Sequence, residues 1–137
     1  MVNKLYEIEI VKTFFNKHCR ERIIYELNSK KKRMNAISRL CHDFKEVLKI
    51  DYMKEINCVD YKEVLEQIKK YSGANACYVI SYNKEVDGLY MELDDALKSI
   101  VGLGMPSLVV CNMQNKLAYF EAEQVNGAPP RYILEMS

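Results

Sequence analysis

The stretch ACYVI, residues 76–80, indicates the fold class more directly than any other segment of this chain. It places apolar and aromatic side chains at consecutive positions, which is typical of a strand buried on both faces. Residues 107–111 (SLVVC) have the same character and predict a second interior strand. These two strands form the centre of the predicted sheet.

A turn and a short helix are predicted between the two interior strands. Asp87-Gly88 is a turn sequence. Asp94 and Asp95 suit the first turn of a helix, because carboxylates complement the positive end of the helix dipole. We expect this inserted helix to end near Gly102, since glycine favours helix termination.

The chain beyond residue 111 predicts a hairpin and one further strand. Residues 113–116 suit the hairpin loop, and residues 117–123 its returning strand. Residues 126–130 (NGAPP) predict a second turn, and residues 132–136 a last strand. We place this last strand at a sheet edge, because the prolines before it cannot donate to a β-ladder.

The N-terminal half has helical periodicity instead. Apolar stripes predict helices over residues 4–17, 19–27 and 30–43, with a break at Asn28-Ser29. Residues 49–59 lack a clear period and suit a connector. A further helix begins after Asp60, which forms a capping-box pattern with Glu63, and ends near Gly73.

The order of these elements predicts an α+β fold. About four N-terminal helices pack on a mostly antiparallel sheet of about four strands with one inserted short helix. A length of 137 residues suits a single domain over residues 1–137, with a helical half (1–73) and a β-rich half (74–137).

Composition limits the cellular setting. No stretch approaches the ~20 apolar residues of a membrane span, and the acidic N-terminus does not suit a signal peptide. The five cysteines are odd in number and scattered, so we expect reduced thiols and a cytoplasmic protein. We expect no membrane association.

Charge is distributed unevenly along the chain. Residues 1–48 hold 11 Lys and Arg against 6 Asp and Glu, a net +5, whereas residues 49–137 hold 9 against 13, a net −4. Such a dipole can steer a charged partner toward the protein. The leading functional hypothesis is therefore a small protein-binding module, such as an immunity or antitoxin-like protein or a regulatory subunit.

The pairs His18-Cys19 and Cys41-His42 consist of residue types that bind metal ions, and their mirrored order suggests a metal-binding site. Neighbours on a helix point about 100° apart, so adjacent residues rarely converge on one ion. Helical periodicity places Cys19 and Cys41 on the apolar faces of their helices, where we expect them to be small packing residues. We predict no metal and no cofactor. A Cys-His catalytic site would need a cleft that sequence adjacency does not provide.

The basic run at residues 30–33 raises nucleic-acid binding as an alternative function. A helix over residues 30–42 would present polar side chains suited to phosphates and base edges: Lys32, Asn35, Ser38, Arg39 and His42. A near-neutral sequence pI of about 7.6 disfavours this alternative.

Arg20 and Arg33 fall within apolar helical stripes. An arginine in such a position pairs with a carboxylate or binds an anion. Glu21 and Glu26 are the nearby acids. The sequence leaves open whether Arg20 and Arg33 are structural or bind an anionic ligand or partner.

A small enzyme is the second alternative. Glu121 and Glu123 are predicted to share one face of a strand with Tyr119, about 6.6 Å apart, a spacing that suits paired carboxylates. No companion motif accompanies this acidic face, so we assign no catalytic residue.

Overall fold

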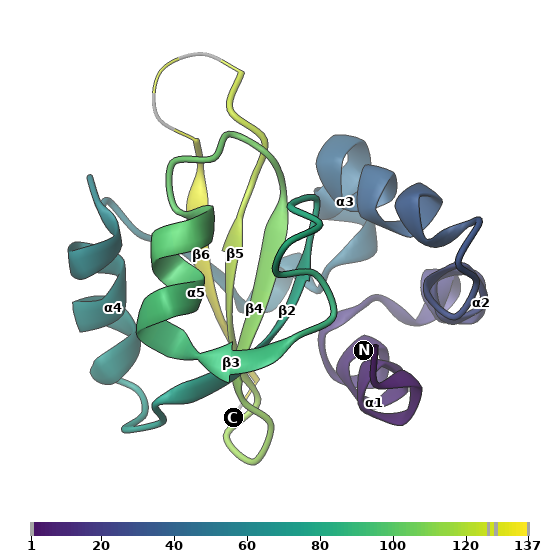
Figure 1. Cartoon of the computed structure of the whole chain (residues 1–137), viewed down its shortest axis with the longest axis horizontal. Helices are drawn as coiled ribbons and strands as arrows, with labels where there is room; N and C mark the ends of the chain where they lie inside the picture. Colours follow the sequence, from purple (N-terminus) through teal and green to yellow (C-terminus); the bar gives the residue numbers. More distant parts are fainter. Residues whose placement is uncertain (1, 126, 128, 137) are drawn as a thin grey trace.

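A six-stranded antiparallel sheet lies between two layers of helices (Figure 1). The computed structural model describes residues 2–125, 127 and 129–136. The order across the sheet is β1-β6-β5-β4-β2-β3. The strands are β1 (Met53–Glu55), β2 (Ala76–Ser81), β3 (Tyr90–Glu92), β4 (Ser107–Asn112), β5 (Leu117–Glu121) and β6 (Arg131–Glu135).

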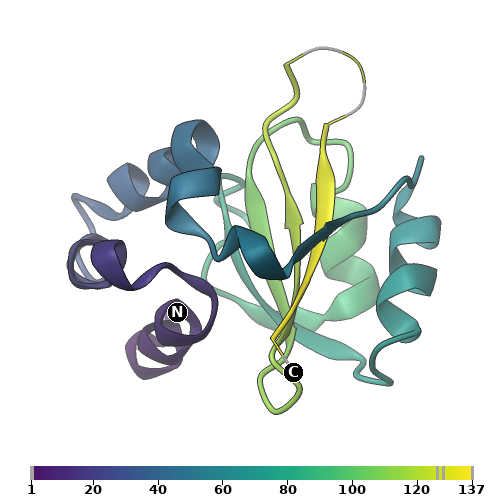
Figure 2. The same ribbon diagram turned by 180° about the vertical axis from the view of Figure 1, so that it is seen from behind.

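Helices cover both faces of this sheet. Figures 1 and 2 show the three N-terminal helices on one side and the two later helices on the other. The first layer contains α1 (Lys4–Phe14), α2 (Arg20–Leu27) and α3 (Arg33–Val47), and the second contains α4 (Tyr61–Lys69) and α5 (Leu93–Ile100). Short 3-10 turns η1 (Lys17–Cys19) and η2 (Ile50–Tyr52) precede α2 and β1.

The two layers explain why the central strands are apolar at consecutive positions. Leu108 and Val110 of β4 belong to the core under α1–α3, whereas Val109 and Cys111 belong to the core under α4 and α5. Alternate side chains of a strand point to opposite faces, so a strand covered on both sides needs apolar residues throughout. The interior position predicted for residues 76–80 and 107–111 is confirmed, as is the α+β class.

Helix boundaries follow local capping. The carboxylate of Asp60 accepts a hydrogen bond from the Glu63 amide at 3.0 Å, which confirms the predicted cap of α4. The Glu63 carboxylate accepts from the amide of Val59 at 3.4 Å. In α3, Asp43 leaves helical geometry (φ −131°, ψ 31°) at the predicted end of that helix, but the helix continues to Val47 beyond this kink.

Two parts of the predicted sheet are wrong. The last strand, β6, is not an edge strand, because β1 pairs with its outer side through residues 53–55. The edges are β1 and β3, each only three residues long, and neither was predicted. Strands this short carry too few residues for a recognisable alternation. The turn predicted at residues 126–130 includes positions outside the described residues.

Two further observations concern the apolar character of the helices and the state of the cysteines. Among the described residues, no helix has the length and apolar character needed to cross a bilayer. All five cysteines are free thiols, and three of them are buried.

Candidate functional site

Arg33 is held entirely by groups within the protein. Its guanidinium donates two hydrogen bonds to Glu7 (2.8 and 2.7 Å) and two to Asp87 (2.7 and 3.0 Å). A fifth goes to the Leu27 carbonyl at 3.1 Å. Arginine has five N–H donors, so Arg33 has none left for a ligand.

The Arg33 network joins three parts of the chain. Tyr78 donates its hydroxyl to Glu7 at 2.8 Å, and Asp87 accepts from the Ser81 amide at 3.0 Å. Burial, together with the adjacent Glu7 carboxylate, raises the pKa of Tyr78. The acids that lie near Arg33 in the sequence, Glu21 and Glu26, are not its partners: these come from α1 and from the β2–β3 connection.

Arg20 has a different environment. Its Nε donates to the Phe15 carbonyl at 3.2 Å, and no carboxylate among the described residues forms an ion pair with it. Burial lowers the pKa of Lys49, and the charges of Arg20 and Lys116 lower it further. Lys49 and Lys116 line a pocket of about 230 Å³ together with Lys12. These lysines are too far apart in sequence for a pattern to reveal them.

The exposed face of α3 gathers most of the residues predicted to contact nucleic acid. Asn35, Ser38, Arg39 and His42 line one shallow surface depression with Asp43. Arg39 is paired with Glu26 through two hydrogen bonds of 2.9 and 3.0 Å.

Lys32 is absent from that depression. Its ammonium group lies over the ring of Tyr25, 5.1 Å from the centroid. Arg33 and Arg39 of the predicted helix are therefore paired with carboxylates of the protein, and Lys32 lies away from the other predicted contact residues.

The predicted acidic face does not exist as one surface. Tyr119 and Glu121 are fully buried, and the Tyr119 hydroxyl donates to Glu121 at 2.7 Å. Arg131 donates to Glu121 at 2.9 Å and to the Cys58 carbonyl at 2.8 Å. The strand ends at Glu121, so the alternation that would align Glu123 with Glu121 stops there.

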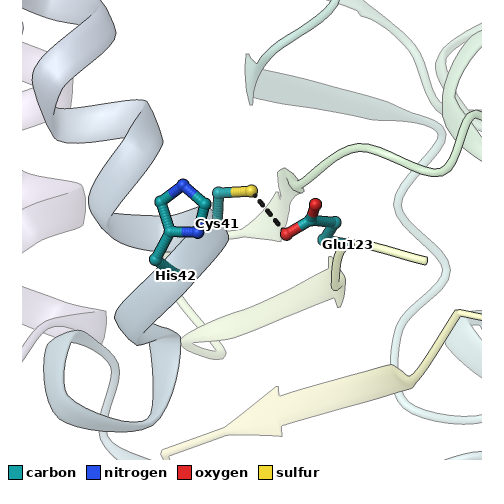
Figure 3. A group of neighbouring side chains, drawn as sticks. All are labelled: Cys41, His42 and Glu123. Atoms are coloured by element: carbon teal, nitrogen blue, oxygen red, sulfur yellow. Dashed lines mark hydrogen bonds between the residues drawn. The ribbon is translucent and has the colours of Figure 1, made fainter. Parts of the chain in front are cut away.

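Glu123 instead joins the Cys41-His42 pair. The Cys41 thiol donates to the Glu123 carboxylate at 2.9 Å. Figure 3 shows these two side chains pointing toward one another from α3 and from the segment after β5, with the His42 ring beside Cys41. One potential ligand atom from each residue lies within 4.8 Å of the other two. The prediction that Cys41 serves only as an inward packing residue is wrong.

A groove of about 360 Å³ adjoins this cluster. Phe44 and Tyr132 line it beside Cys41 and Glu123. Burial, and then the Glu123 carboxylate, raise the pKa of Cys41 to about 12, so the thiol is neutral near pH 7. A neutral thiol is a poor nucleophile, and the geometry gives little support to Cys-His covalent catalysis.

A third surface lies at the β3 edge of the sheet. Leu5 of α1 is 79% exposed and Tyr90 of β3 is 67% exposed. The half-buried ring of Tyr6, the residue after Leu5, contacts Tyr90, with the two ring centroids 6.1 Å apart. Sequence reasoning missed this patch, since residues 6 and 90 become neighbours only when α1 packs over β2.

Comparison of the chain with protein-family models, curated proteins and solved structures finds no match.

Proposed function

We propose that the protein is a cytoplasmic protein-binding module that takes a cationic segment of a protein partner at the β3 edge. The observation that carries this proposal is the exposure of Tyr90 beside an acidic stretch of chain, together with exposed Leu5 next to Tyr6, whose ring contacts Tyr90. Tyrosine is enriched among interface residues that dominate binding energy, since it offers apolar area and a hydroxyl at low entropic cost. The five free thiols suit a reducing compartment.

The charge around the patch selects the kind of partner. Residues 84–98 hold five Asp and Glu against two Lys, and four of these acids remain after Asp87, which is paired with Arg33. Glu92, Asp94 and Asp95 are exposed and follow Tyr90 directly through the start of α5. Complementary charge steers association and disfavours acidic partners, so the expected partner segment is rich in Lys and Arg.

The open sheet edge adds a further recognition element. β3 pairs with β2 through residues 76–78, and no strand among the described residues pairs with its other side. Backbone groups at such an edge can accept an extended peptide. The strand is only three residues long, so side-chain contacts at Leu5 and Tyr90 supply most of the specificity.

Nucleic-acid binding by α3 receives less support. Arg33 has no free donor and Arg39 is paired with Glu26, so the helix offers few uncompensated charges to phosphate. A gel shift that is lost with Lys32→Ala plus Arg39→Ala would favour that alternative over the one proposed.

The test combines crosslinking with charge variants. A photoreactive amino acid at position 90 should capture a partner through a basic peptide, whereas the same group at Val59, which is 76% exposed, should not. Leu5→Glu and the triple reversal of Glu92, Asp94 and Asp95 to Lys should abolish capture, and Val59→Glu should leave it intact. Equal capture at both positions, or capture that survives charge reversal, would exclude the proposed surface.

A further inference from the structure

Cys41, His42 and Glu123 bring together three types of metal ligand. Thiolate, imidazole and carboxylate are the groups that zinc uses in proteins. Their ligand atoms lie within 4.8 Å of one another in the described structure. In a tetrahedral zinc site, bond lengths near 2.0–2.3 Å place ligand atoms about 3.3–3.6 Å apart.

Small side-chain movements would bring the three ligand atoms to the distances of a tetrahedral zinc site. The Cys41 Sγ and Glu123 Oε2 atoms, now 2.9 Å apart, would separate by about 0.6 Å as the ion replaces the thiol proton. His42 is exposed and can turn its ring without displacing core side chains. Cys41 and His42 are adjacent on the helix and point in different directions, but the His42 side chain is long enough to turn back toward Cys41. The third ligand, Glu123, comes from another segment and approaches both.

The backbone on both sides of Glu123 is fixed. The Ala122 amide donates to the Pro130 carbonyl at 2.9 Å, and the Gln124 amide donates to the Gly104 carbonyl at 3.0 Å. Two hydrogen bonds flanking one residue restrict where its carboxylate can go. A preorganised ligand loses little entropy when it binds an ion.

The helix that supplies the other two ligands is anchored as well. Phe44, three residues after Cys41, packs its ring 5.2 Å from that of Phe120 and 5.6 Å from that of Tyr132. These contacts hold α3 against β5 and β6. The distance between the helix and Glu123 is therefore set by the core.

Charge at the cluster matches a divalent cation. Among the described residues, the Cys41 thiol donates to Glu123, and no lysine or arginine forms an ion pair with it, although Lys45 lines the adjoining groove. Binding of Zn²⁺ would release the thiol proton to solvent. The thiolate and the carboxylate then balance the two positive charges of the ion, with His42 neutral.

We infer that Cys41, His42 and Glu123 form a zinc-binding site with one open coordination position. Three protein ligands and a fourth position for water or another ligand are the arrangement of zinc sites that react or exchange ligands. Cys41 and Glu123 also line the groove with Phe44 and Tyr132, so a group bound there can reach the ion. This inference is independent of the proposed partner surface.

Cobalt titration of the reduced, full-length protein tests the inference. Co²⁺ bound by a thiolate gives a sulfur-to-metal charge-transfer band, and Zn²⁺ should abolish that band by displacement whereas excess Mg²⁺ should not. Cys41→Ser should remove the band. His42→Ala and Glu123→Gln should each weaken Zn²⁺ binding at least about tenfold.

The chain supplies matched controls. Cys19→Ser and His18→Ala remove the other half-buried cysteine and the other histidine, and both should bind cobalt as the parent does. Circular dichroism verifies that each variant is folded, and Glu123→Gln provides a test that leaves the thiol in place. Absence of a cobalt–thiolate band in the parent, or its loss in the control variants rather than the cluster variants, would overturn the inference.

Discussion

Replacement of Arg33 by methionine should destabilise the protein by about 3–5 kcal/mol. The side chain of Arg33 is 11% exposed and that of Glu7 is 1% exposed. Methionine fills much of the same volume but donates no hydrogen bond. The Glu7 carboxylate would remain buried with only the Tyr78 hydroxyl as a partner.

The magnitude can be worked from the individual bonds. Asp87 is 14% exposed, so water can replace part of what it loses. Glu7 cannot be rehydrated in this way and loses two charge-assisted bonds, each contributing about 1.5–3 kcal/mol. The resulting range of about 3–6 kcal/mol agrees with measured costs of breaking buried ion pairs.

Urea unfolding followed by circular dichroism measures this loss. Arg39→Met is the matched control: the same residue type on the same helix, 31% exposed and paired with Glu26. Glu26 is itself 5% exposed but keeps Arg22 at 3.6 Å, so we expect a smaller loss of about 1–2 kcal/mol. Glu7→Gln combined with Arg33→Met should cost less than the sum of the single changes, because no buried charge is left unpaired. If Arg33→Met costs under about 1.5 kcal/mol, or the two changes are additive, Arg33 does not join α1 and α3 to the β2–β3 connection as argued.

Three further outcomes follow from other contacts. Asp60→Ala should cost about 1 kcal/mol, measured by the same unfolding assay, because the α4 cap loses its acceptor. Phe120→Ala should cost about 3–5 kcal/mol, since its ring is fully buried beneath α3. The unfolding free energy should fall as pH rises from about 9 toward 12: burial raises the pKa of Cys77 to about 12, so the folded state keeps a proton that the unfolded chain releases. A flat unfolding free energy across that window, in pH-dependent urea titrations, would contradict the buried environment of Cys77.

The central strands could be predicted because burial on both faces leaves a strong signal. Val79 and Val109 are apolar for the same reason as their neighbours on the opposite face, so the run is unbroken. The cap at Asp60 was also predictable, since a capping box acts over three residues. The edge strands β1 and β3 were not, because three exposed or half-buried residues are placed in a sheet by pairing alone.

The candidate sites show the same limit. Sequence spacing identified Arg33 as a charge in an apolar stripe, but it favoured acids nearby in sequence over Glu7 and Asp87, which are 26 and 54 residues away. It also aligned Glu123 with Glu121 by extending the strand too far. The period of a strand carries information only up to its last ladder residue, and nothing local marks Glu121 as that residue.

The two buried ionic networks limit which side chains are available to bind a ligand or a partner. Arg33 fixes α1 and α3 to the β2–β3 connection, and Arg131 fixes Glu121 and the Cys58 carbonyl on the other side of the sheet. A side chain whose donors are spent on the fold cannot bind a ligand without breaking it. The recognition proposed above therefore rests on groups whose loss the core tolerates. The aromatic edge at Tyr90 and the cluster around Cys41 meet that condition, because both lie on the surface of a framework that the buried pairs hold rigid.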